Sequence, residues 1–186
     1  MIPLNHDFKV FVDNKRYERL IKNNDVLSVV LNLALIMENF TNVYIKEVSH
    51  EEYHDLFLDK KQKQHFKLNV AKTLGLPESI IIAINRLSGL RNSFAHKLDY
   101  CLTEKAISEF ESDVGKIPLE DVTNDGPLNA KEVASYFDSG SKLLGSENYS
   151  INPDVIRLVN ATYLLALKSA FFTVSELHRR GKLSLG

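Results

Sequence analysis

The sequence is dominated by one long apolar stretch, residues 26–44, which reads VLSVVLNLALIMENFTNVY. Its apolar side chains recur at the i, i+3, i+4 spacing of a single helix face, and Asp25 stands directly before them as an N-cap. The apolar positions are Val26, Val29, Val30, Leu33, Ile36, Met37, Phe40, Val43 and Tyr44. Because so little of the stretch is polar, it predicts a helix in the middle of a helical bundle.

The residues that follow carry further helix signals. A short charged element is expected at residues 51–58, and residues 61–74 predict a helix that ends at Gly75, a common C-terminal stop. We place Phe66, Leu68, Val70, Ala71 and Leu74 on the buried side of that helix. Pro77 and Glu78 suit the first turn of the next helix, because proline lacks an N–H that would be unpaired there and glutamate complements the dipole.

The second half of the chain contains a break between helices. Thr103 begins a short helix that runs to about residue 114, whereas residues 115–129 contain the turn-forming Pro, Asn, Asp and Gly of a surface loop. Asn152 and Pro153 then start a long final helix, residues 154–178. Its apolar stripe is wide, as expected of a central helix or one shared with a second subunit. The whole pattern predicts an all-α bundle of about five to seven helices.

Length and composition limit the possible classes of protein. The 186 residues, 44% of them hydrophobic, predict one domain, residues 1–186. The 23 basic and 24 acidic residues give a net charge of −1, so any contact with RNA must be a local basic patch. The single cysteine, the lack of an N-terminal signal sequence and the lack of a long uninterrupted apolar run predict a cytoplasmic protein with no membrane contact. We predict no cofactor and no metal site.

One hexapeptide stands out at the end of the helix that begins near Pro77: Arg91-Asn92-Ser93-Phe94-Ala95-His96. Arginine offers a permanently charged planar fork for phosphate oxygens, and histidine exchanges protons near neutral pH. On an unbroken helix the two side chains would point roughly 140° apart. The helix therefore loosens at residues 93–95, or the arginine reaches round on its long side chain. Phe94 and Ala95 are expected in the core.

A purely structural role for the hexapeptide is the alternative. Arg91 would then cap the C-terminal end of its helix, and His96 would donate a hydrogen bond to a carbonyl in the following turn. Neither side chain would be free to contact a substrate.

The Arg-x4-His spacing, with a polar residue directly after the arginine, resembles the HEPN superfamily. The resemblance implies a HEPN-like helical homodimer whose cleft holds the arginine and histidine of both subunits, and a metal-independent endoribonuclease acting as a toxin or defence effector. His96 would act as general base or acid, Arg91 would hold the phosphate, and Asn92 would orient a group by hydrogen bonding. HEPN toxins controlled by a nucleotidyltransferase antitoxin carry a tyrosine two residues after the histidine, where this chain has Leu98.

A wider segment, residues 67–110, also resembles the mannitol operon repressor-like (MtlR-like) proteins, many of which share the Arg-Asn-x-x-Ala-His run. That resemblance implies a non-catalytic transcriptional regulator that acts through a protein partner. The sequence agrees with action through a partner, since it shows no helix-turn-helix with a basic second helix. The two resemblances leave two functions open. One is a ribonuclease, whose expected partners are RNA and an antitoxin, and the other is a regulator.

Weaker candidates lie outside the hexapeptide. Lysines before the motif form the nearest basic run that could contact RNA phosphates, namely Lys60, Lys61, Lys63 and Lys67. Glu38 interrupts the most apolar helix, and a carboxylate there would need a partner such as Arg91, which would make it a supporting group of the same site. A basic C-terminal tail at residues 178–182 is a second electrostatic candidate. The apolar excess of residues 26–44 and 155–177 predicts a homodimer.

Overall fold

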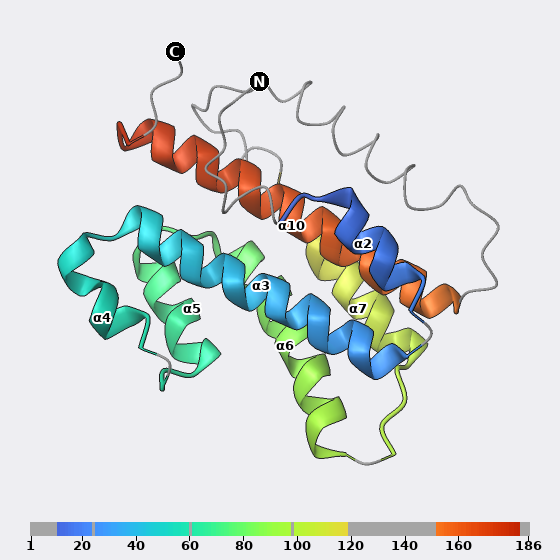
Figure 1. Cartoon of the computed structure of the whole chain (residues 1–186). Coiled ribbons are helices and arrows are strands. Elements are labelled where there is room, and N and C mark those ends of the chain that lie inside the picture. Colours follow the sequence, from blue (N-terminus) through green and yellow to red (C-terminus); the bar gives the residue numbers. More distant parts are fainter. Residues whose placement is uncertain (1–10, 24, 60, 98, 119–151, 183–186) are drawn as a thin grey trace.

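The computed structural model of the chain describes residues 11–23, 25–59, 61–97, 99–118 and 152–182, and within them every regular element is a helix (Figure 1). The elements in chain order are α2 (Asn14–Ile21), α3 (Val26–Val48), the short 3₁₀ helix η1 (Glu51–Tyr53), α4 (His54–Phe57), α5 (Gln64–Thr73), α6 (Glu78–His96), α7 (Glu104–Gly115) and α10 (Pro153–Arg179). This arrangement confirms the all-α bundle predicted from the sequence.

The apolar stretch forms α3, a helix of 23 residues that packs on α5, α6 and α10 (Figure 1). Its N-terminal end is capped as expected, because the Asp25 side chain accepts a hydrogen bond from the Leu27 N–H at 3.2 Å. Its predicted apolar face is buried in the core of the bundle from Val29 onward, with Leu33, Phe40 and Tyr44 fully covered, whereas Val26 is half-buried. The central position predicted for this helix is therefore confirmed.

Helix α10 is the second long core helix. Asn152 caps it by accepting a hydrogen bond from the Asp154 N–H at 3.0 Å, and Pro153 occupies the first turn. It packs against α2, α3, α6 and α7, so its wide apolar stripe is covered by its own chain. By length and composition alone, α3 and α10 could each cross a membrane, but 50% and 72% of their most apolar windows are buried inside the bundle. Core helices of a bundle meet the same criterion.

The turn between α5 and α6 depends on Gly75, which has a φ of +104°. This left-handed conformation lets the Leu76 N–H donate to the Ala71 carbonyl at 2.9 Å, so the predicted C-terminal stop is confirmed. Helix α5 begins at Gln64, three residues later than expected. Phe66 was placed in the core wrongly: it is 37% exposed, because it lies roughly 200° round the helix from the buried Leu68.

Helix α7 begins where Thr103 predicts, with the threonine hydroxyl accepting a hydrogen bond from the Ala106 N–H at 3.2 Å. The loop expected at residues 115–129 begins later, because Gly115 is the last residue of α7 and Ile117 is buried in the core. Residues 119–129 of that prediction lie outside the described ranges.

Helix α2 was not predicted. Asp13 caps it by accepting a hydrogen bond from the Lys15 N–H at 3.1 Å, and the buried Tyr17 and Ile21, four residues apart, face the core. The Tyr17 hydroxyl donates to the Phe11 carbonyl at 3.0 Å, and its ring packs beside that of Tyr163 on α10. Burial, the largest effect, raises the pKa of the Tyr17 hydroxyl far above its ordinary value.

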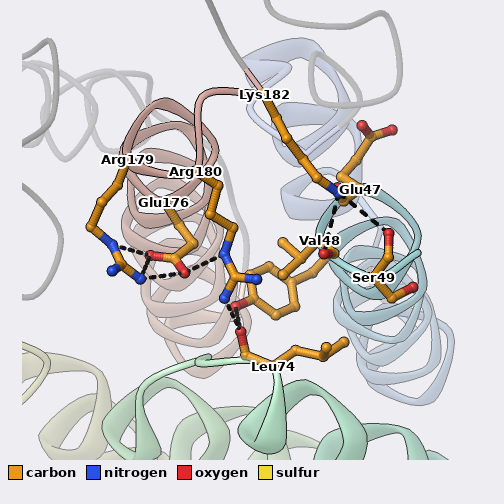
Figure 2. A network of polar contacts seen from close by, with 9 residues as sticks. Glu47, Val48, Ser49, Leu74, Glu176, Arg179, Arg180 and Lys182 are labelled. Atoms are coloured by element: carbon orange, nitrogen blue, oxygen red, sulfur yellow. Dashed lines mark hydrogen bonds and ion pairs between the residues drawn. The ribbon is translucent and has the colours of Figure 1, made fainter.

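Two cations at the end of α10 bind the carbonyl ends of other helices (Figure 2). Arg180 donates to the Leu74 carbonyl, the C-cap of α5, at 2.6 Å. Lys182 donates to the carbonyls of Glu47 at 2.9 Å and Val48 at 3.3 Å, in the last turn of α3. Such contacts pair carbonyls that have no partner within their own helix.

A third cation, Lys168, does the same from the middle of α10. It is only 6% exposed, and its ammonium donates to the carbonyls of Val114 and Ile117, both at 2.9 Å, at the end of α7. Burial lowers the pKa of Lys168 below its ordinary value, because the charged form loses hydration. The cations of α10 and the residues just after it thus complete the ends of α3, α5 and α7.

Candidate functional site

The hexapeptide lies on the last turns of α6, which is helical without a break from Glu78 to His96. The Lys97 N–H closes the last turn by donating to the Ser93 carbonyl at 3.0 Å. Of the two alternatives for bringing Arg91 and His96 together, a loosened helix at residues 93–95 is therefore wrong. One face of α6 is buried and carries Ile80, Ile81, Ala83, Ile84, Leu87 and Leu90.

The opposite, polar side of α6 borders a cavity of about 700 Å³. Helix α6 contributes one wall, made of Asn85, Ser88, Gly89, Arg91, Asn92 and His96. The facing wall is formed by the residues just before α5 and in its first turn, namely Lys61, Gln62, Lys63, Gln64 and His65. Glu38 of α3 lies beside this wall. The three hexapeptide candidates Arg91, Asn92 and His96 therefore border the same space, although the helix between them is unbroken.

The Arg91 side chain is oriented by two neighbours. It donates to the Asn92 side-chain oxygen at 3.0 Å, and its other terminal nitrogen lies 3.7 Å from the Glu38 carboxylate. The side chains of Arg91 and Glu38 are 38% and 29% exposed, so solvent reaches the pair. Arg91 thus reaches back to α3, and among the described residues it makes no hydrogen bond to the carbonyl end of its own helix. Glu38 is therefore paired with Arg91, the partner suggested from the sequence.

His96 is the last residue of α6 and is exposed. In the described part of the chain no hydrogen bond or ion pair involves its ring, so the backbone contact required by the purely structural alternative is not made. The neighbouring Phe94 is half-buried and packs edge-on against the Tyr100 ring, with 4.8 Å between centroids. Ala95 was placed in the core wrongly: it is exposed, because the buried residues of α6 end at Leu90 and its last turn extends beyond the core.

The four lysine candidates do not form one patch beside the cavity. Lys61 and Lys63 border the cavity and are exposed. Lys67 was assigned to the basic patch wrongly: it is only 6% exposed, because it lies beside Leu68 on the inner face of α5. Lys60 lies outside the described ranges. The basic patch is therefore smaller than the sequence predicts, and lies at the rim of the cavity.

Several bordering residues were not selected from the sequence. Asn85 and Ser88 precede the selected Asn92 at intervals of three and four residues, which places all three on one face of α6; this spacing was a usable signal for Asn85 and Ser88. Gln64 was not predictable in the same way, because its position depends on how α5 docks on α3. Its amide donates to the Thr41 hydroxyl at 3.1 Å and holds the start of α5 against α3.

The basic tail is engaged within the chain. Glu176, which is 5% exposed, accepts hydrogen bonds from both Arg179 and Arg180, the shortest at 2.7 Å and 2.6 Å respectively (Figure 2). Although burial opposes its charge, the hydrogen bonds and charges of the two arginines together hold the pKa of Glu176 below its ordinary value. The second electrostatic candidate is thus largely committed to contacts within the bundle.

The site combines groups that bind anions with groups that exchange protons. Arg91, Lys61 and Lys63 supply positive charge, His96 and His65 supply imidazoles, and the amides supply neutral donors and acceptors. Among the described residues no three His, Cys, Asp or Glu side chains come together as a metal-binding group.

Comparisons of this chain with protein-family models, with curated proteins and with solved structures found no match.

Proposed function

We propose that the chain is a HEPN-like, metal-independent endoribonuclease of the cytoplasm, a toxin or defence effector. The observation that carries the proposal is the convergence of Arg91, Asn92 and His96 on one solvent-accessible cavity with Lys61 and Lys63 at its rim. A phosphate bound at Arg91 would have cationic neighbours, and an imidazole borders the same space.

In the proposed reaction the phosphate lies against the Arg91 guanidinium, whose orientation is set by the Asn92 side chain. His96 removes the proton from the ribose 2′-hydroxyl, and the 2′-oxygen forms a bond to phosphorus. The bond from phosphorus to the 5′-oxygen breaks, and that oxygen takes up a proton from a water molecule, since solvent reaches the site. The products are a 2′,3′-cyclic phosphate and a 5′-hydroxyl, and Arg91 stabilises the charge that develops on the phosphate.

The test is cleavage of single-stranded RNA in the presence of EDTA. The wild type should produce 2′,3′-cyclic phosphate ends, whereas Arg91→Ala and His96→Ala should lose activity. Both variants should change the free energy of unfolding by less than about 1 kcal/mol, because the two side chains are solvent-accessible. His50→Ala is a matched control, since His50 is an exposed histidine that does not border the cavity.

Three results would contradict the proposal. Cleavage that requires Mg²⁺ would contradict the metal-independent reaction. Full activity of His96→Ala would exclude His96 as the general base. A loss of several degrees in melting temperature for both variants, with no defect beyond lower abundance, would make the hexapeptide structural.

A second candidate is a non-catalytic, MtlR-like regulator that acts through a protein partner. The ion pair between Glu38 and Arg91 favours it, because a carboxylate 3.7 Å from the guanidinium reduces the attraction of this site for RNA. This candidate would be supported if the wild type cleaves no RNA while Arg91→Ala, folded normally, still abolishes its effect on cell growth or transcription.

A further inference from the structure

Gly89 is a glycine in the interior of α6 whose presence the packing of the chain does not explain. A glycine inside a helix costs roughly 0.5 to 1 kcal/mol relative to alanine. A Cβ atom built at Gly89 would meet nothing within 4 Å, so alanine would fit among the neighbouring side chains. Gly75 differs, because it needs a positive φ and its Cβ would lie 3.4 Å from Arg180.

The open space above Gly89 is the cavity. The bare helix surface there is flanked by the neutral polar side chains of Asn85 and Ser88, and the facing wall carries Gln62 and Gln64. Toward the end of α6 the same cavity is bordered by the charged group Arg91 and by His96. The cavity therefore has a neutral, hydrogen-bonding part beside a part that can bind an anion.

A nucleotide has an anionic group beside a neutral, hydrogen-bonding group, which matches the two parts of the cavity. Its phosphate is an anion that pairs with guanidinium, and its base is a flat ring whose edges carry hydrogen-bond donors and acceptors. An amide side chain offers a donor and an acceptor at once, and the lack of a side chain at glycine allows a flat ring to approach the helix closely. The volume of about 700 Å³ lies within the range of small-molecule sites.

We infer that the cavity binds one nucleotide of single-stranded RNA, with the phosphate at Arg91 and the base against the helix surface at Gly89. The choice of RNA as the source of the nucleotide rests on the proposed ribonuclease function. The base subsite itself rests on Gly89 and the amides around it, and it gives the site a preference for unpaired nucleotides over other phosphates.

The test uses glycine substitutions that keep the fold. Gly89→Ala and Gly89→Leu place a side chain in the base subsite, and Gly115→Ala is a matched control, because Gly115 lies in α7 and its Cβ would also meet nothing within 4 Å. Both alanine variants should melt at or above the wild-type temperature, since alanine favours helix. Calorimetry would measure binding of inorganic phosphate, adenosine 3′-monophosphate and uridine 3′-monophosphate to each variant.

The wild type should bind at least one of the two nucleotides more tightly than inorganic phosphate. Gly89→Leu should weaken nucleotide binding by about tenfold or more, with Gly89→Ala intermediate, and should leave phosphate binding within about twofold. Arg91→Ala should weaken the binding of all three probes, and Gly115→Ala should change none.

The inference is overturned if both nucleotides bind no more tightly than phosphate, or if Gly89→Leu binds them as the wild type does. The proposed ribonuclease function fails separately, by an absence of RNA cleavage in a protein that shows the expected binding pattern. Cleavage that persists unchanged in Gly89→Leu would contradict the base subsite but not the proposed ribonuclease function.

Discussion

Replacing Glu38 with glutamine should tighten the binding of phosphate in the cavity. The Glu38 carboxylate lies 3.7 Å from a terminal nitrogen of Arg91 and competes with any anion for that guanidinium. Glutamine keeps the shape of the side chain and removes the charge. The change should alter stability by less than about 1 kcal/mol, because the ion pair is long and partly exposed.

The size of the effect follows from the distance. A phosphate oxygen bound at about 2.8 Å to the same terminal nitrogen of Arg91 would lie at most about 6.5 Å from the carboxylate oxygen. Two unit charges at that separation repel by about 0.6 kcal/mol in water and by about 2.6 kcal/mol at an effective dielectric constant of 20. Since solvent reaches both side chains, we expect an effect in the lower half of this range, roughly three- to tenfold in the dissociation constant.

Calorimetric titration with inorganic phosphate at low ionic strength measures this change. Glu109→Gln is the control, because Glu109 pairs with Arg86 at 2.8 Å and neither residue borders the cavity. The reasoning is refuted if Glu38→Gln binds phosphate no more tightly than the wild type, since Arg91 would then not be the phosphate contact.

Two further predictions concern the bundle. Lys168→Met should lower the free energy of unfolding by about 2 kcal/mol, because the Ile117 carbonyl loses its Lys168 partner and the Val114 carbonyl keeps the Ile117 N–H at 3.3 Å, whereas the exposed Lys105→Met should change it little. Burial lowers the pKa of Lys168 in the folded state, so between that pKa and the ordinary 10.5 the unfolded state binds more protons than the folded state. The wild type should therefore gain stability relative to Lys168→Met as the pH rises through that window. Urea unfolding at several pH values would measure this difference. Light scattering should show a homodimer at micromolar concentration, with Leu35→Glu shifted to monomer because Leu35 is a 57% exposed apolar residue on α3; a wild type that is monomeric throughout would contradict the dimer.

Helix positions were largely predictable, because the signals that start and stop a helix are local. Asp25, Thr103 and Asn152 each cap the helix that follows them, and Gly75 ends α5 as expected. A cap needs only the residues of its own turn, so the sequence contains all the information it requires. Helix α2 was missed although Asp13 gives the same signal.

The burial of charged side chains was not predictable from the sequence. Lys67 and Lys168 are both 6% exposed, although lysine is rarely buried. Whether a lysine is covered depends on which carbonyls or apolar surfaces other helices bring to it. The Lys168 partners lie more than fifty residues earlier in the chain.

The candidate site was predictable in part. The hexapeptide pattern selected Arg91, Asn92 and His96, and Lys61 and Lys63 border the same cavity. The neutral wall was missed for two different reasons. The polar face of α6 was predictable from the spacing of its polar residues. The approach of residues 61–65 to α6 was not, because it depends on how α5 packs on α3, which no local pattern encodes.

The cations of α10 and its end have a consequence for biosynthesis. A nascent chain that has emerged only as far as α7 lacks the groups that complete the carbonyl ends of α3, α5 and α7, because Lys168, Arg180 and Lys182 are translated after those three helices. It also lacks α10, one of the helices that cover the core face of α3. The bundle can close only after α10 has emerged from the ribosome, so premature termination before residue 168 yields a chain with an exposed apolar core, a substrate for chaperones and proteases.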